Sequence, residues 1–90
     1  MHSIKKQTPE LVLFVKRKGC PYCEKMIELL QRRGLYPQLV YVEDVKDLFL
    51  KSHSTVPRLY FRGKHKGDYN TVNLQDAMHG ERLFLEYILK

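Results

Sequence analysis

Two cysteines, the only ones in this 90-residue chain, stand three positions apart as Cys20 and Cys23. Apolar residues 11–15 precede them and residues 24–33 carry a helical pattern, which predicts a strand, then the two thiols, then a helix. Cys20 would lie at the helix N-terminus, where unpaired N–H groups, the helix dipole and the cations at 16–18 favour a thiolate. Cys23, one turn on, would lie close enough to attack a disulfide formed on Cys20, so the pattern predicts a redox dithiol.

Two other interpretations of the cysteine pair remain open. A C-x-x-C pair can be half of a zinc site, which needs two further ligands. The chain has no second C-x-x-C, and its four histidines are scattered without an H-x3–5-H pair. The two thiols can also be neighbours in sequence without a common chemistry. The redox dithiol is favoured because the strand, the thiols and the helix agree, and we expect no metal ligands.

Length and charge restrict the class of protein. Ninety residues predict a single domain over 1–90, with residues 1–9 as a polar tail. No apolar stretch has the length of a membrane span, and the N-terminus lacks the apolar region of a secretory signal. Two cysteines paired by spacing predict a reducing compartment, hence the cytoplasm. The net charge of +6 comes from basic residues that cluster beside the thiols and around 58–66, so a small anionic ligand or an acidic partner fits as well as nucleic acid does. We expect neither nucleic acid nor a membrane as a partner.

Strands and helices alternate along the rest of the chain. Residues 11–15 form a continuous apolar run, which predicts a central strand buried on both faces. The strand–helix–strand unit that follows predicts two parallel strands. The predicted elements are strands at 11–15, 39–42, 57–61 and 65–66, a hairpin turn at 62–64, and helices at 23–33, 45–51 (with Asp44 as N-cap) and 71–90 (jointed at Gly80).

The helical patterns also predict which side chains face the core. In the first helix these are Met26, Ile27 and Leu30 beside Cys23, with Leu29 at the border. In the last helix they are Leu74, Ala77 and Met78 on one face and Leu83, Phe84, Tyr87 and Ile88 on another.

These residues resemble the glutaredoxins, small oxidoreductases of the thioredoxin fold. Cys20-Pro21-Tyr22-Cys23 matches the dithiol motif of the family, and Arg17 matches a basic position that contacts glutathione there. Thr55-Val56-Pro57 matches a T-V-P whose proline is cis and faces the dithiol, although only about 5–6% of X–Pro bonds in folded proteins are cis. Residues 74–79 with Leu83 look like the closing helix, so the resemblance covers 11–90. It implies an α/β, thioredoxin-like (glutaredoxin) fold, with a small central mixed sheet of about four strands flanked by helices.

One loop departs from the family pattern, which is usually Gly-Gly-x-x-Asp ahead of a leucine. In the family, the second glycine and the aspartate help to hold the γ-glutamyl end of glutathione. Here Asp68 replaces that glycine, and Thr71 or Asn73 takes the place of the aspartate, depending on the alignment. The resemblance therefore implies a weaker γ-glutamyl anchor, for which Asp68 can compensate. The other interpretation of Asn70, Thr71 and Asn73 is helix capping.

The resemblance implies a thiol–disulfide oxidoreductase that reduces protein disulfides and protein–glutathione mixed disulfides. Cys20 would be the nucleophile and Cys23 the resolving thiol, with glutathione as reductant and co-substrate, no tightly bound cofactor, and a monomeric chain. The implied glutathione contacts are Arg17, Tyr22, Thr55, Val56, Pro57, Asp68, Tyr69, Thr71 and Asn73.

Two alternatives belong to other classes of function. One is a dithiol electron donor, for example to ribonucleotide reductase, that is recharged by thioredoxin reductase. The other is a homodimer that holds a [2Fe–2S] cluster through Cys20 and external glutathione. Within the family, a proline after the first cysteine is unfavourable for the cluster.

Overall fold

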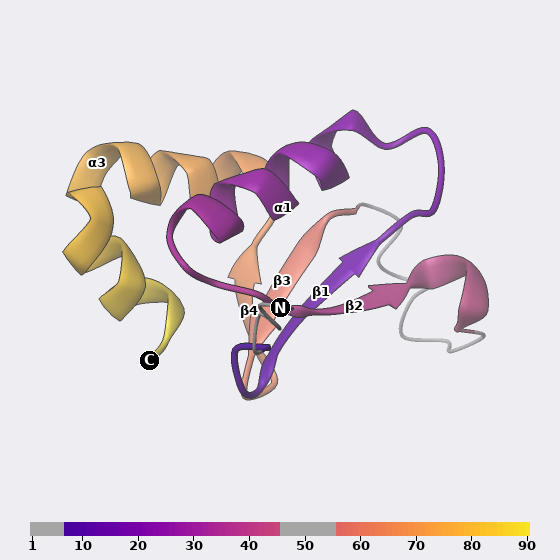
Figure 1. Ribbon diagram of the computed structural model, residues 1–90, viewed down its shortest axis with the longest axis horizontal. Coiled ribbons are helices and arrows are strands. Elements are labelled where there is room, and N and C mark those ends of the chain that lie inside the picture. Colours follow the sequence, from indigo (N-terminus) through magenta and orange to yellow (C-terminus); the bar gives the residue numbers. More distant parts are fainter. Residues whose placement is uncertain (1–6, 46–55) are drawn as a thin grey trace, which may run out of the picture.

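A computed structural model describes residues 7–45 and 56–90. Figure 1 shows a sheet of short strands with long helices lying along it. The elements are β1 Leu11–Val15, α1 Pro21–Arg32, β2 Gln38–Tyr41, the 3-10 helix η1 Val42–Asp44, β3 Arg58–Phe61, β4 Lys64–Gly67 and α3 Tyr69–Ile88. Of the predicted helix 45–51, only Val45 is described, and its backbone is extended.

The sheet has the strand order β2-β1-β3-β4, with β1 parallel to β2 and antiparallel to β3. The predicted mixed sheet of four strands and the inner position of β1 are thus confirmed. Arg62 and Gly63 join β3 to β4, and both have positive φ, at 51° and 78°. Two such residues match the right-handed twist of a hairpin, which explains why the predicted turn forms here.

Both helices pack on the face of the sheet that carries Leu11, Leu13 and Val15. The opposite face of β1 carries Val12 and Phe14, which are only half-buried in the described structure. The prediction that β1 is buried on both faces is therefore wrong in this respect, because alternate side chains of a strand point to opposite faces. The core comprises Leu11, Leu13, Val15, Cys23, Met26, Leu29, Leu30, Leu35, Leu59, Phe61, Val72, Phe84 and Ile88.

Helix α1 begins at Pro21, which needs no N–H partner at the first helical position. It ends at Arg32, and just beyond it Gly34 has a positive φ of 76°, which lets the chain turn back. Gly34 N donates to Gln31 O at 3.0 Å and Leu35 N donates to Leu30 O at 2.8 Å, which is the Schellman arrangement. Leu29, predicted at the border of the apolar face, is fully buried, whereas Ile27 is half-buried.

Helix α3 is two helical pieces joined at Gly80, as predicted, but its inward face differs from the prediction. Gly80 has φ 72°, and the helix begins at Tyr69 instead of 71. The predicted inward residues Leu74, Ala77, Met78 and Leu83 are exposed, and Val72 is buried with Phe84 and Ile88. One turn beyond Val72 lies Asp76, which pairs with Arg33 at 2.7 Å. The side of α3 facing α1 thus carries a polar contact that an apolar pattern does not reveal.

One edge of the sheet gathers segments that are distant in sequence. Val15 at the end of β1 pairs with Tyr41 at the end of β2, and Phe14 pairs with Arg58 at the start of β3. Leu59 pairs with Gly67 at the end of β4. The segments that follow β1, β2 and β4 and the one that precedes β3 therefore meet at this edge.

The far end of the sheet holds the start of the described chain. Thr8 N donates to Tyr36 O at 2.8 Å, and Thr8 Oγ1 accepts from Tyr36 N at 2.9 Å. The last residues of the predicted tail are thus bonded to the chain ahead of β2. Within residues 7–45 and 56–90, no helix is long and apolar enough to cross a bilayer.

Candidate active site

Cys20 and Cys23 are joined by a disulfide, with their Cα atoms 5.3 Å apart. Cys20 is the N-cap of α1, and Cys23 N donates to Cys20 O at 3.1 Å, which closes the first helical turn. Cys20 is half-buried, whereas Cys23 is only 3% exposed and packs in the core. Cys20 is therefore the more accessible of the two residues and Cys23 the more shielded.

The loop before Cys20 places positive charge beside the sulfur. Residues 16–18 are two lysines and an arginine, all exposed. Gly19 has φ 73°, a conformation that glycine adopts at little cost, and it turns the chain from β1 into α1. The cations and the N-terminal end of α1 both favour an anion at Cys20.

The Val56–Pro57 segment lies beside the dithiol. The Val56–Pro57 peptide bond is cis, as the resemblance implied. The carbonyl oxygen of Val56 lies 4.0 Å from Cys20 Sγ, and Pro57 is buried. The segment reaches this place because β3 runs antiparallel to β1 and starts at the edge where β1 ends.

A cavity of about 150 Å³ opens on the Val56 side of the dithiol. The aromatic rings of Tyr22 and Tyr69 line it, with their centroids 5.7 Å apart. Lys25 Nζ lies 5.3 Å from the centroid of Tyr22, which is 53% exposed. The lining residues are Tyr22, Val56, Pro57, Asp68, Tyr69 and Asn70. We call this cavity the Val56 pocket.

Asp68 caps the helix that borders this pocket. Its Oδ1 accepts a hydrogen bond from Thr71 N at 2.9 Å, and this bond is the main reason why the pKa of the Asp68 carboxyl is lowered. Gly67 packs so closely that a Cβ there would lie 2.8 Å from Thr71 Cβ. Asp68 therefore caps α3 and also lines the Val56 pocket, whereas Thr71 contributes only to the start of the helix.

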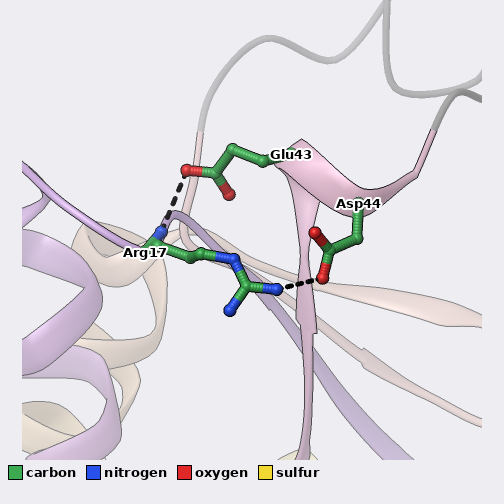
Figure 2. Close-up of polar contacts among 3 residues, drawn as sticks. All are labelled: Arg17, Glu43 and Asp44. Carbon is green, nitrogen blue, oxygen red and sulfur yellow. Dashed lines mark hydrogen bonds and ion pairs between the residues drawn. The ribbon is translucent and has the colours of Figure 1, made fainter.

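Arg17 lies three residues before Cys20, and Figure 2 shows its polar contacts with Glu43 and Asp44 in the segment that follows β2. Its guanidinium donates to Asp44 Oδ2, and its backbone N donates to Glu43 Oε2 at 3.0 Å. The guanidinium carbon also lies 4.2 Å from the centroid of the Tyr41 ring. The hydrogen bond from Arg17 N is the main reason why the pKa of the Glu43 carboxyl is lowered.

Arg17 borders a second cavity, of about 390 Å³, between the dithiol and β2. We call it the β2 pocket. Its apolar floor includes Val15, Ile27, Leu39 and the Tyr41 ring, and both cysteines reach it. Cys20 thus lines the β2 pocket, and its sulfur lies 4.0 Å from the carbonyl of Val56, a residue of the Val56 pocket.

The structure brings together some of the residues predicted to contact glutathione and separates others. Tyr22, Val56, Pro57, Asp68 and Tyr69 line the Val56 pocket. Arg17 lies in the β2 pocket, while Thr71 and the exposed Asn73 line neither cavity. Thr55 lies outside the described residues.

Asn70, in the 69–73 loop that was expected to line the site, lines the Val56 pocket. Sequence reasoning missed three residues near the dithiol, namely Tyr41, Glu43 and Asp44, which surround Arg17. A signal for the last three was present, because parallel strands end at one edge and the residues following each strand then meet there. Among residues 7–45 and 56–90, no group of three His, Cys, Asp or Glu side chains could hold a metal ion.

A family model described as glutaredoxin matches residues 11–66, more than half of the 90-residue chain. No curated protein sequence matches the chain.

Several solved glutaredoxins share the fold. The holo form of poplar (Populus tremula × tremuloides) glutaredoxin C1 has 24% identity, a TM-score of 0.64, and covers 87% of this chain and 85% of its own. A buckwheat glutaredoxin–glutathione complex has 24% identity, a TM-score of 0.67, and covers 88% of this chain and 76% of its own. A dithiolic glutaredoxin from Trypanosoma brucei brucei has 21% identity, a TM-score of 0.65, and covers 84% of this chain and 86% of its own.

Proposed function

We propose that this chain, which belongs to the glutaredoxin family and is a thiol–disulfide oxidoreductase, takes its electrons from glutathione. Its substrates are protein disulfides and protein–glutathione mixed disulfides. The observation that carries the proposal is the position of Cys20, which is half-buried, lines the β2 pocket and has its sulfur 4.0 Å from the Val56 carbonyl, while Cys23 is 3% exposed. We also propose that the protein acts in the cytoplasm, because thiols are kept reduced there.

The reaction on a glutathionylated protein needs only Cys20. Its thiolate attacks the glutathione sulfur, a new disulfide forms between Cys20 and glutathione, and the protein sulfur leaves as a thiolate that takes up a proton. A second glutathione thiolate then attacks the bound glutathione sulfur. Glutathione disulfide leaves and the Cys20 thiolate is restored, so each turnover consumes one free glutathione and exchanges the disulfide bond of the substrate for that of glutathione disulfide.

The reaction on a protein disulfide uses both thiols. Cys20 attacks one sulfur and forms a mixed disulfide, and Cys23 then attacks Cys20 Sγ and releases the substrate as a dithiol. The product is the Cys20–Cys23 disulfide, the state in which the two residues stand here. Two glutathiones reduce it again and leave as glutathione disulfide.

The linings of the two cavities support glutathione as the small thiol. The Val56 pocket offers the Asp68 carboxylate, which suits the amino group of a γ-glutamyl end. The β2 pocket offers Arg17, which suits the glycine carboxylate at the other end. In this arrangement the thiol of glutathione, midway along the molecule, lies at Cys20. The structure of the similar buckwheat glutaredoxin is a glutathione complex, which also supports the proposal.

A coupled assay tests this function. Reduction of a glutathionylated peptide is followed first with glutathione and glutathione reductase, and then with thioredoxin reductase alone. The proposal expects turnover in the first case and little in the second, and it expects Cys20→Ser to abolish turnover. Full turnover with thioredoxin reductase alone, and none with glutathione, would make the chain a dithiol electron donor instead.

A further inference from the structure

The guanidinium of Arg17 is already bound to a carboxylate of its own chain. Asp44 Oδ2 accepts its hydrogen bond, and the Tyr41 ring lies against its carbon at 4.2 Å. Glu43, by contrast, takes only the backbone N–H of Arg17, at 3.0 Å (Figure 2). A ligand carboxylate that reaches Arg17 therefore competes with Asp44, and not with Glu43 or Tyr41.

The Arg17–Asp44 pair is accessible and can be exchanged. The two side chains are 51% and 56% exposed, so an anion from solvent can approach either partner. Exposed ion pairs of this kind contribute little net free energy, because water solvates both charges well. The pair is thus weak enough for a ligand to break, yet its rupture still weakens ligand binding.

The fold holds Asp44 in this competing position. Strands β1 and β2 are parallel, and the last residues of both, Val15 and Tyr41, are paired. Arg17 follows the first strand by two residues and Asp44 follows the second by three, within η1. Arg17 N also donates to Glu43 Oε2 at 3.0 Å, which ties the two segments together.

We propose that Asp44 competes with the glycine carboxylate of glutathione for Arg17, and thereby sets how tightly the site holds its reductant. The inference rests on the proposed function, since it assumes that glutathione is the ligand. Asp44 is a specificity-determining residue in this account and takes no part in the thiol chemistry. A ligand without that carboxylate gains nothing from displacing Asp44, so the contact affects carboxylate ligands selectively.

The test compares Asp44→Asn with wild type in two measurements. The first is the Michaelis constant for glutathione in the coupled assay. The second is the dissociation constant of S-methylglutathione, which cannot react, measured by NMR titration of the reduced protein. Both are repeated with the ligand esterified at its glycine carboxylate. We expect Asp44→Asn to lower both constants about two- to fivefold for the free acid, and to leave the ester constants and kcat unchanged.

Three control variants separate competition from general charge effects. Glu43→Gln removes a neighbouring negative charge that does not touch the guanidinium, and Glu10→Gln removes one at the other end of β1, where Glu10 pairs with Arg62. Both should change the constants less than Asp44→Asn does. In an Arg17→Ala background, Asp44→Asn should have no effect, because the site of competition is gone.

Each other outcome overturns the inference. Weaker binding in Asp44→Asn would mean that Asp44 positions Arg17 for the ligand, and an equal gain for acid and ester would mean a field effect. If Arg17→Ala binds S-methylglutathione as wild type does, Arg17 is not the carboxylate site. In all three cases, turnover with glutathione in the coupled assay would still support the proposed function. A failure of the inference about Asp44 can therefore be distinguished from a failure of the proposed function.

Discussion

At the scale of single residues, the two sulfurs differ in what surrounds them. Cys20 caps α1 beside the cations at 16–18, whereas Cys23 is 3% exposed within the core. A cysteine thiol titrates near ~8.5 in water, and a helix N-terminus with nearby cations lowers that value while burial in apolar surroundings raises it. The pair therefore divides the work between an accessible nucleophile and a shielded resolving thiol.

Alkylation of the reduced protein at mildly acidic pH should label Cys20 first. The reason is that only a thiolate reacts quickly, and Cys20 has the lower pKa in this account. Peptide mass spectrometry reads the site of labelling. Cys20→Ser serves as the control, in which the remaining thiol should react slowly, and faster labelling of Cys23 would reverse the assignment.

Asp68→Ala should lower the free energy of unfolding by about 1 kcal/mol at neutral pH, because the cap on Thr71 N is lost. The pKa of the Asp68 carboxyl is lowered in the folded state, chiefly by that bond. Its charged form thus stabilises the fold above the pKa of the unfolded chain, and this contribution is lost as pH falls through the lower folded value. Asp68→Asn retains a capping oxygen but does not titrate.

Urea unfolding at neutral pH and near pH ~3 checks this dependence, the lower value lying below the usual range of an aspartate. The stability difference between wild type and Asp68→Asn should shrink at the lower pH. An Asp68→Ala protein as stable as wild type at neutral pH would show that the cap contributes nothing.

At the scale of elements, α3 starts where the backbone of Gly67 comes very close to the side chain of Thr71. Gly67 has φ 128°, and a Cβ there would lie 2.8 Å from both Cβ and Cγ2 of Thr71. Gly34 also has a positive φ, of 76°, but a Cβ there would meet nothing within 4 Å. Substitution of either glycine would thus strain the backbone, but only at Gly67 would the new Cβ overlap with another side chain.

Gly67→Ala should therefore destabilise the protein more than Gly34→Ala. Strain at a positive φ costs about 1–2 kcal/mol in either variant, and the overlap with Thr71 adds about 1–3 kcal/mol in the first. Thermal unfolding followed by circular dichroism compares them. Equal losses of stability would mean that the start of α3 moves away from Gly67 without cost.

The elements also show which structural features a sequence pattern can predict. Runs of apolar β-branched residues predicted β1 and β2, and glycines predicted the hairpin turn and the joint in α3. Phe84 and Ile88 in the second piece of α3 were predicted correctly, but the inward face of the first piece was wrong, because Val72 is buried and Asp76 takes an inward place against Arg33. Such a pairing depends on how α1 and α3 pack, which local periodicity does not contain.

The same limit applies to the site. Cys20, Cys23 and the cis bond at Pro57 were expected from short motifs, since each motif lies within a few residues. The contact of Arg17 with Asp44 joins residues 27 positions apart and arises from the parallel pairing of β1 and β2. It follows from topology, so a motif could not predict it.

At the scale of the whole molecule, the chain carries a formal charge of +6. Long-range attraction raises the local concentration of an anionic thiol such as glutathione, and salt screens it over about 10 Å at 0.1 M. The surface charge and Arg17 therefore act on the same ligand, one at a distance and the other at contact.

The purified protein should be colourless and monomeric. The reason is that the proposed cycle uses Cys20 as a free nucleophile, which a cluster ligand cannot be. Size-exclusion chromatography with visible absorption measures both properties. A brown dimer that loses its colour when glutathione is removed would favour the [2Fe–2S] alternative.

The most direct test of the central claim, that Cys20 forms a mixed disulfide with glutathione, is the intact mass of the Cys23→Ser protein after reaction with glutathione disulfide. Without the resolving thiol, the intermediate should accumulate as one glutathione per chain, mapped by peptide digestion to Cys20 and removed by added glutathione. Cys20→Ser under the same conditions should stay unmodified. An unmodified Cys23→Ser protein, or an adduct that glutathione does not remove, would contradict the account.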